Sequence, residues 1–320
     1  MRLTLDTTAD MLFLGCAGTV AVTAASSLGI TEGLGCSLRL LVAVWTIAPA
    51  ACLAFTRLKI SASGKAVLVT GCDSGFGYQL ALYLDRIGFR VFAGCLRAES
   101  QGEGAEKLRI FGSSKLHVLQ LDVTKRGEVK SARRQIQALL QQGEVLWGLV
   151  NNAGVTCLGL AEWATVDRYK QTADVNIFGM VAVTQTFLPL IKQSRGRIVN
   201  VGSMVGRLPQ PFFTGYVVTK YAVEGFSDCL RVEMRPWRVK VSVIEPGNFA
   251  KATGFGREEE LLRQEEELWA NMDDDLRQEC PRQKLEQSQA LRVFRKVPKE
   301  RYMPMDLHTF VRIFVATPFP

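Results

Sequence analysis

Histidine is scarce in this chain of 320 residues, which contains only His117 and His308. A zinc site built from histidines and a Ser-His-Asp triad both require this residue, so both are disfavoured and no metal site is expected. His117 lies within the apolar run 116–121, which predicts a packed strand histidine rather than a ligand. Acid–base chemistry in this protein therefore needs a different side chain.

Paired cysteines and clustered basic residues are also missing. The eight cysteines are scattered without a C-x-x-C pair, and no Asn-x-Ser/Thr sequon occurs. This usage is typical of a reduced compartment and disfavours a scaffold held by disulfides. The formal net charge of +8 is not gathered into a basic stretch with interleaved aromatics. Nucleic acid is therefore not an expected partner.

Long apolar runs are present near the N-terminus. Met11 to Ile30 and Leu40 to Thr56 contain no charged residue, and Arg57 and Lys59 follow the second run. Because about 20 apolar residues cross a bilayer core, we expect residues 1–60 to form a membrane anchor in contact with lipid, as a hairpin or a single span. A cleaved targeting peptide and a helical pair packed on the next domain remain open alternatives.

Beyond Gly64, short apolar runs alternate with longer helical patterns, which is typical of βαβ units. The pattern predicts an α/β fold: a Rossmann-type, doubly wound parallel sheet with helices on both faces, over residues 61–253. Residues 254–320 are expected to cap the substrate pocket and to approach the membrane. Strands are predicted at 66–70, 90–94, 117–121, 149–150, 196–201 and 239–244, and helices at 79–87, 125–141, 169–193, 216–235 and 257–276.

A glycine-rich loop follows the first predicted strand and opens a helix, which is the context of a dinucleotide site. Gly71 permits the tight turn, Gly75 lets the backbone approach the pyrophosphate, and Gly77 allows close helix packing. The helix N-terminus then offers free N–H groups to the phosphates. The cofactor-binding residues predicted here are Thr70, Gly71, Asp73, Ser74, Gly75, Phe76 and Gly77.

Tyr216 and Lys220 are four residues apart at the start of a predicted helix, so their side chains share one face. A phenol with a pKa near 10 is a poor base at neutral pH. A neighbouring ammonium lowers that pKa, and so does the positive ring of an oxidised nicotinamide. Ser203 ends the fifth predicted strand, on the side where α/β sheets bind ligands.

Together with Asn151-Asn152-Ala153-Gly154, these motifs resemble the short-chain dehydrogenase/reductase family over residues 64 to about 250. The resemblance implies that Tyr216 is the general acid/base, that Ser203 binds the substrate oxygen and that Lys220 binds the nicotinamide ribose. Asn176 matches the asparagine that holds a relay water. The resemblance adds Asn152, Ala153, Gly154, Asp122 near the adenine, and Pro246 and Gly247 beside the nicotinamide to the cofactor site.

Shorter stretches resemble a branch of that family containing membrane-bound 3-hydroxybutyrate, hydroxysteroid and retinol dehydrogenases. Phe226 to Arg231 and Arg301 to Asp306 look closest to the mitochondrial 3-hydroxybutyrate enzymes, whereas the apolar N-terminus looks more like the steroid enzymes. We therefore expect oxidation of (R)-3-hydroxybutyrate to acetoacetate at a mitochondrial membrane. The alternative is a hydroxysteroid or retinol dehydrogenase of the endoplasmic reticulum. Family members associate through helices 169–193 and 216–235, which implies a homodimer or homotetramer.

The sequence departs from the family pattern in two places. An acidic residue usually ends strand two to bind the NAD ribose, but Cys95-Leu96-Arg97 stands there. Arg97 could attract the 2′-phosphate of NADP and Asp73 would oppose it, so we expect NAD without excluding NADP. The stretch from Gly254 to Arg301 also looks shorter than in related enzymes. An inactive nucleotide-binding membrane protein therefore remains an alternative.

Overall fold

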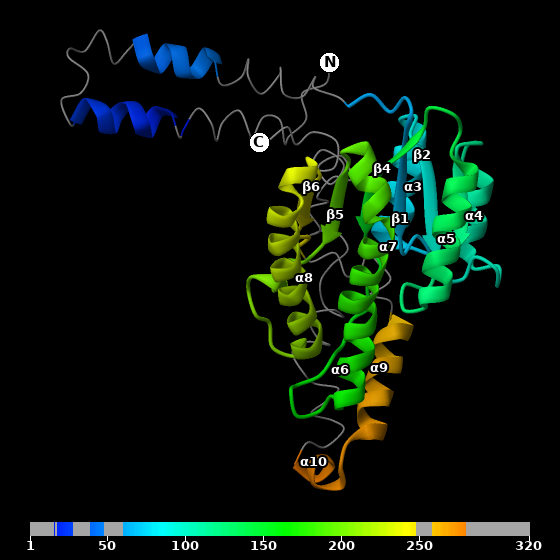
Figure 1. Ribbon diagram of the computed structural model, residues 1–320. Coiled ribbons are helices and arrows are strands. Elements are labelled where there is room, and N and C mark those ends of the chain that lie inside the picture. Colours follow the sequence, from blue (N-terminus) through cyan, green and yellow to red (C-terminus); the bar gives the residue numbers. More distant parts are fainter. Residues whose placement is uncertain (1–15, 17, 28–38, 48–59, 248–257, 280–320) are drawn as a thin grey trace. The chain divides into compact units, whose positions relative to one another are not determined.

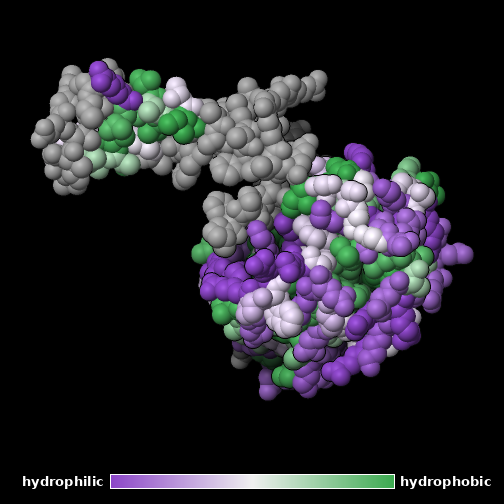
Figure 2. Space-filling view, turned by 45° about the horizontal axis from the view of Figure 1, so that its top comes forward, coloured by the Kyte–Doolittle hydropathy of each residue, from purple (hydrophilic) through white to green (hydrophobic). Residues whose placement is uncertain are grey.

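The computed structural model describes residues 16, 18–27, 39–47, 60–247 and 258–279. The chain divides into two compact units, residues 1–61 with 315–320, and residues 62–314. In the first unit, residues 18–27 and 39–47 are helical, and the Trp45 indole donates a hydrogen bond of 3.0 Å to the Thr19 hydroxyl. The described residues of these segments are mainly hydrophobic in Figure 2. The remainder of the expected anchor lies outside the described residues.

The second unit contains six parallel strands in the order β3-β2-β1-β4-β5-β6. The strands are β1 (Lys65–Thr70), β2 (Arg90–Cys95), β3 (Leu116–Gln120), β4 (Val145–Asn151), β5 (Arg197–Val201) and β6 (Lys240–Ile244). β1 and β2 are almost completely buried, because helices cover both faces of the sheet. The predicted doubly wound α/β fold is confirmed, and each predicted strand agrees with an observed one to within a few residues.

Helices cover the two faces of this sheet in two groups (Figure 1). The helices α5 (Arg126–Leu139), α7 (Met180–Ser194) and α8 (Thr214–Glu233) pack on one face, where Phe187, Ile191 and Leu230 share a core with Leu68 and Leu149. The helices α3 (Gly75–Arg86) and α4 (Glu103–Phe111) pack against β1, β2 and β3. The sequence analysis did not predict α4, which buries only Ala105 and Leu108 and therefore carries a weak apolar pattern.

The long helix predicted at 169–193 is confirmed but is not regular. It consists of α6 (Val166–Ala173), a π-helical segment Asp174–Gly179, and α7. It is also the one helix in the described part of the chain that is long and apolar enough to cross a membrane. Its residues Val183, Phe187 and Ile191 belong to the core of the sheet. This helix is therefore accounted for by packing within the second unit.

The C-terminal described region consists of α9 (Glu258–Asn271) and α10 (Asp274–Glu279), where the sequence predicted one helix. Leu261 of α9 packs with Leu158, Val205, Phe213 and Val217 in a separate apolar cluster. This cluster lies next to the segment that carries Ser203 and Tyr216, so α9 contributes to the same end of the unit. Three-residue 3₁₀ turns at Met204–Gly206 and Arg235–Trp237 complete the described elements.

The tight contact between α3 and the end of β1 yields a test of the fold. A methyl group at Gly77 would overlap the carbonyl oxygen of Gly71 and lie 2.5 Å from the side-chain nitrogen of Asn152. Gly77→Ala should therefore lower the free energy of unfolding by about 1–3 kcal/mol in urea titrations. Gly127→Ala, in an exposed turn of α5 where a methyl group meets nothing within 4 Å, is the control and should not destabilise. Equal stability of both variants would contradict this packing.

Candidate active site

The site lies at the carboxyl ends of β1 and β4, which are neighbours in the sheet although β2 and β3 come between them in sequence. Strand order reverses at this point, which is where doubly wound sheets bind ligands. A cavity of about 450 Å³ opens here. The predicted site residues that line it are Gly71, Asp73, Ser74, Gly75, Phe76, Asp122, Asn152, Ala153, Gly154, Ser203, Tyr216, Lys220, Pro246 and Gly247.

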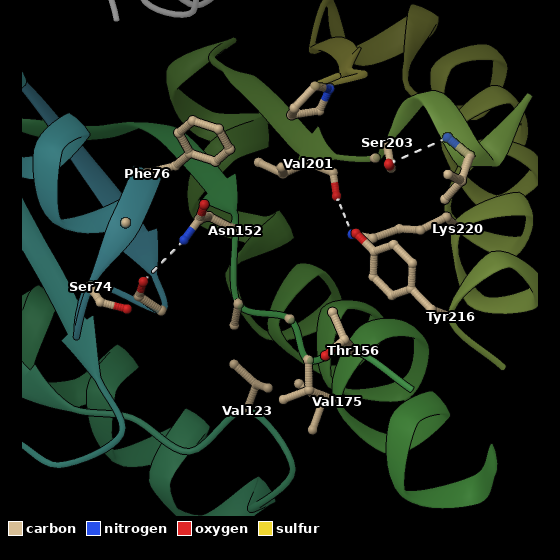
Figure 3. Close-up of a pocket in the computed structure, with 18 of the residues that line it drawn as sticks. Ser74, Phe76, Val123, Asn152, Thr156, Val175, Val201, Ser203, Tyr216 and Lys220 are labelled. Carbon is tan, nitrogen blue, oxygen red and sulfur yellow. Dashed lines mark hydrogen bonds between the residues drawn. The ribbon is translucent and has the colours of Figure 1, made fainter. Parts of the chain in front are cut away.

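Thr70 and Gly77 do not line the cavity but hold its glycine loop in place. The Thr70 hydroxyl accepts hydrogen bonds from the backbone N–H groups of Asn152 and Ala153, both at 3.0 Å. The Asn152 side chain donates in return to the carbonyl oxygens of Thr70, at 2.9 Å, and Gly71, at 3.0 Å. These four hydrogen bonds join the loop after β1 to the loop after β4, and Figure 3 shows the Asn152 side chain pointing toward the glycine loop.

The glycine loop has the shape that a dinucleotide requires. Gly71 and Gly75 adopt φ values of +69° and +58°, which residues other than glycine rarely adopt. The N-cap Ser74 makes no side-chain hydrogen bond to the first turn of α3, and the N-terminus of this helix is the kind of site that binds an anion. A pyrophosphate fits this loop because Gly71, Ser74 and Gly75 line the cavity next to the N-terminus of α3.

Asp73 turns back toward the end of β2. Its carboxylate accepts the backbone N–H groups of Leu96, at 2.8 Å, and Arg97, at 3.1 Å. Arg97 itself is exposed and does not line the cavity. A negative charge in the glycine loop therefore stands where the family usually places one at the end of strand two.

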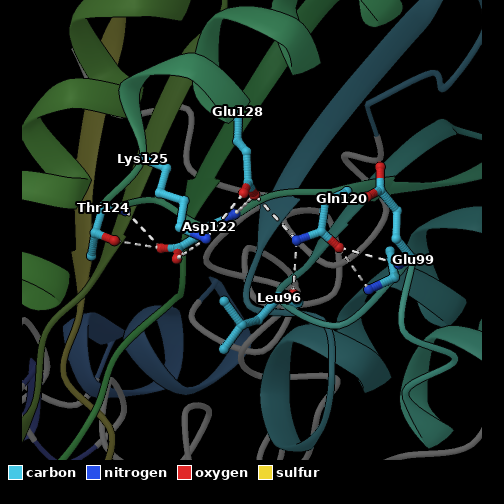
Figure 4. Close-up of polar contacts among 8 residues, drawn as sticks. Leu96, Glu99, Gln120, Asp122, Thr124, Lys125 and Glu128 are labelled. Atoms are coloured by element: carbon cyan, nitrogen blue, oxygen red, sulfur yellow. Dashed lines mark hydrogen bonds and ion pairs between the residues drawn. The ribbon is translucent and has the colours of Figure 1, made fainter.

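Two polar residues that the sequence analysis missed hold the next loops of this rim (Figure 4). The Gln120 side chain accepts the backbone N–H groups of Ala98 and Glu99 and donates to the carbonyl oxygen of Leu96 at 2.8 Å. The Glu128 carboxylate accepts the backbone N–H of Asp122 at 2.7 Å. These contacts fix the loops after β2 and β3, and Asp122 lines the cavity.

Ser203, Tyr216 and Lys220 meet at the other end of the cavity (Figure 3). Ser203 follows β5, and both other residues project from the first turns of α8. The ammonium nitrogen of Lys220 donates to the carbonyl oxygen of Val201 at 2.8 Å and lies 5.4 Å from the Tyr216 ring centroid. Tyr216 and Ser203 line the same end of the cavity. The predicted trio is therefore brought together.

Burial controls the protonation of these groups. It raises the pKa of Tyr216 to about 12, although the hydrogen bond with Ser203 opposes the rise. It lowers the pKa of Lys220 to about 8, and the carboxylate of Glu224 opposes that fall. The lowering of the Tyr216 pKa expected from Lys220 is not seen in the chain alone, because burial is the largest influence on this pKa and raises it.

Asn176 lies in the π-helical segment and is buried behind the cavity wall. Its side-chain oxygen accepts the N–H of Val155 at 2.8 Å, and its nitrogen donates to the Val155 carbonyl at 2.9 Å and the Thr219 hydroxyl at 3.0 Å. Both donor hydrogens are thus used within the protein. Asn176 ties the loop after β4 to α8, and its predicted part in a water relay stays a prediction.

The described remainder of the cavity is mostly apolar, with Thr156 and Gln210 as uncharged polar contributors. Arg207, which could bind a substrate carboxylate by its position after Ser203, is paired instead with Glu224 and Glu245. Gln210 lines the cavity. The apolar lining on this side includes Leu158, Met204, Val205, Phe213 and Leu261.

Comparison with known proteins agrees with this geometry. The model of the family "short chain dehydrogenase" matches residues 65–260. D-beta-hydroxybutyrate dehydrogenase, mitochondrial, of Mus musculus is 39% identical over 282 residues, covering 81% of this chain and 82% of that protein. Retinol dehydrogenase 16 of Mus musculus is 42% identical over 242 residues, covering 74% of this chain and 72% of that protein.

A solved short-chain dehydrogenase from Streptomyces avermitilis aligns with a TM-score of 0.52 and 31% identity, covering 58% of this chain and 67% of that one. The aligned 58% of this chain is about the share occupied by the sheet and helices of the second unit. The family match, the relatives and the glycine loop with its Ser203, Tyr216 and Lys220 agree, and the chain belongs to the short-chain dehydrogenase family, as an oxidoreductase that acts on alcohol groups.

Proposed function

We propose that this protein oxidises a secondary alcohol to a ketone with NAD as the cofactor, and that Tyr216 transfers the proton. The observation that carries the proposal is the convergence of Ser203, Tyr216 and the buried Lys220 at one end of the cavity. General acid/base catalysis requires this proximity between the proton acceptor and the substrate oxygen.

In the proposed reaction, the Ser203 hydroxyl donates a hydrogen bond to the substrate oxygen while Tyr216, as phenolate, accepts its proton. Oxidised nicotinamide, when bound, would supply a positive ring and an acceptor for the hydride of the carbinol carbon. Lys220 stabilises the phenolate only while it is an ammonium ion. A neighbouring group that opposes the loss of the Lys220 proton therefore supports the reaction. The glycine loop, Asn152 to Gly154, and Pro246 with Gly247 hold the cofactor.

Asp73 supports NAD over NADP. Its carboxylate is fixed by the N–H groups of Leu96 and Arg97, so its charge stands at the end of β2 and would repel a 2′-phosphate. Arg97 is the one opposing charge in this segment, and it is exposed. We therefore infer that the charge of Asp73 outweighs that of Arg97 at the ribose.

Asp73→Asn keeps the size of the side chain and removes its charge. We expect the ratio of kcat/KM with NADP to kcat/KM with NAD to rise about tenfold, which corresponds to about 1.4 kcal/mol. Glu99→Gln, which neutralises a nearby acid that does not line the cavity, is the matched control and should leave the ratio within about twofold. An unchanged ratio in the Asp73 variant would remove this residue from cofactor selection.

The favoured substrate is (R)-3-hydroxybutyrate. It is supported by the resemblance to the mitochondrial D-beta-hydroxybutyrate dehydrogenases, which extends over about four fifths of both chains. Thr156 and Gln210 offer polar contacts to a carboxylate. An apolar secondary alcohol is the second candidate. It is favoured by the lining itself, because Lys220 is the only lysine or arginine among the described residues around the cavity.

We further propose that the protein associates with a mitochondrial membrane, with the membrane of the endoplasmic reticulum as the alternative. It is supported by the apolar N-terminal runs and by the mitochondrial relatives. A homo-oligomer is also proposed, and it is supported by exposed apolar side chains on the π-helical segment and α8, among them Phe178, Val218 and Tyr221.

A substrate panel tests the function. Purified protein should reduce NAD with (R)-3-hydroxybutyrate at a kcat/KM at least about tenfold above oestradiol, a corticosteroid and retinol, because each factor of ten reflects about 1.4 kcal/mol of preferential binding. Tyr216→Phe should lower kcat by about 10²–10⁴ while still binding NAD. Preference for a steroid or retinol would select the second candidate. Cofactor binding without turnover of any alcohol would favour an inactive nucleotide-binding protein.

A further inference from the structure

Arg207 joins three segments that each carry a predicted site residue. It immediately follows the 3₁₀ turn after Ser203. Its guanidinium donates to Glu224 of α8 at 3.0 Å and to Glu245, just beyond β6, at 3.1 Å. Glu224 lies one helical turn after Lys220, and Glu245 precedes Pro246 at the nicotinamide turn. One side chain therefore cross-links the segments of Ser203, Lys220 and Pro246.

Glu224 occupies the inner end of this cross-link and is only 5% exposed. Its side chain lies against the two glycines that flank the Ser203 turn. A methyl group at Gly202 would be 2.7 Å from the Glu224 carboxylate oxygen Oε1, and one at Gly206 would be 3.3 Å from its Cγ atom. The Ser203 segment can therefore close over this carboxylate only because both flanking residues lack a side chain.

Backbone hydrogen bonds hold the same segment from the other side. The N–H of Gly202 donates to the Ile244 carbonyl at 2.7 Å, and the N–H of Met204 donates to the Pro246 carbonyl at 3.0 Å. Ser203 thus stands between the end of β6 and α8. Its position relative to Tyr216 and Lys220 depends on how firmly the segment is pressed against α8, which is the contact that Arg207 and Glu224 make.

A purely stabilising role does not account for this pair. Arg207 is 55% exposed, and ion pairs with an exposed partner contribute little to folding free energy. The Glu224 carboxylate is nevertheless buried, and its Oε1 has no hydrogen-bond partner among the described residues. Burying a carboxylate with incomplete hydrogen bonding costs folding free energy, so stability alone does not explain the position of Glu224.

The charges around Glu224 come from three segments. Burial raises its pKa, Glu245 beyond β6 adds to the rise, and Arg207 opposes it; on α8 itself, Asp228 raises the pKa and Arg231 lowers it. Glu224 in turn favours the ammonium form of Lys220. The ionised carboxylate is therefore maintained by Arg207 and acts on Lys220 across one turn of α8.

We propose that Arg207 and Glu224 are positioning residues of the reaction: their ion pair presses the Ser203 segment onto α8, and the Glu224 carboxylate keeps Lys220 charged. This rests on the proposed oxidation of an alcohol by Ser203, Tyr216 and Lys220. Neither residue lines the cavity, so both act through residues that do.

Kinetics of Glu224→Gln, Arg207→Met and Arg207→Lys test the proposal, with the alcohol that the unmodified protein oxidises best. The first two variants should lower kcat about 10- to 100-fold, on the scale of losing part of an acid/base contribution, while the KM for NAD stays within about twofold. Arg207→Lys should recover part of kcat. Glu224→Gln should also move the alkaline fall of kcat/KM to lower pH, because Lys220 then loses its proton more easily.

Asp228→Asn is the matched control, since Asp228 is an exposed acid of the same helix, paired with Arg231. It should leave kcat and the pH profile unchanged. The proposal is overturned if Glu224→Gln and Arg207→Met keep kcat within about twofold of the unmodified protein. It is also overturned if they lose kcat together with thermal stability while the pH profile stays in place.

Amide hydrogen exchange separates this proposal from the proposed function, because it needs no turnover. Glu224→Gln and Arg207→Met should speed exchange in residues 202–207 at least about tenfold relative to Asp228→Asn, reflecting local opening of the segment. Unchanged exchange there would refute the positioning role. Faster exchange in a protein that oxidises no alcohol would refute the proposed function and leave the ion pair's hold on the Ser203 segment established.

Discussion

The four hydrogen bonds between the end of β1 and the end of β4 are the contact on which the rest of the site depends. Thr70 accepts two backbone N–H groups of the β4 loop, and Asn152 returns two donors to the β1 loop. This joins the phosphate-binding loop to the loop that leads toward Val155 and Thr156. The contact requires glycines, since a methyl group at Gly71 would lie 2.7 Å from the Cα atom of Ala153. Once these loops are locked together, both ends of the cavity have fixed positions.

Two sets of polar side chains extend this order outward. At one end of the cavity, Gln120 and Glu128 satisfy the backbone of the loops after β2 and β3, and Asp73 does the same from the glycine loop. On the nicotinamide side, Asn176 ties Val155 to α8, and Arg207 ties the Ser203 turn to α8 and to Glu245. Each set supplies partners to loop backbone or buried charge, so that the residues facing the cavity are held from behind.

The sheet and the facing residues are predictable from the sequence because their signals are local. Strand runs, the glycine loop and the four-residue spacing of Tyr216 and Lys220 are each contained in a short stretch. The supporting residues are not predictable in this way. Gln120 accepts hydrogen bonds from backbone N–H groups more than 20 positions away, and Arg207 donates to Glu245, 38 positions away. The short helix α4 was missed because it buries so little, and the π-helical turn at Asn176 leaves no mark on an apolar pattern.

Two observations favour different classes of substrate. Similarity over most of the chain favours a small hydroxy acid, whereas the described lining near Ser203 and Tyr216 is apolar apart from a few uncharged polar groups and Lys220. Arg207 does not resolve the difference, because Glu224 and Glu245 already bind it. In the proposed reaction, proton transfer depends on Ser203, Tyr216 and Lys220, whereas the choice of substrate depends on the less polar end of the cavity.

The central claim, hydride transfer from an alcohol carbon to a nicotinamide, is tested most directly with isotopically marked substrate. A secondary alcohol carrying deuterium on its carbinol carbon should yield reduced cofactor that is heavier by one mass unit, and its oxidation should be slower than that of the unlabelled alcohol. Reduced cofactor without deuterium, formed while the ketone accumulates, would contradict direct transfer and with it this account of the site.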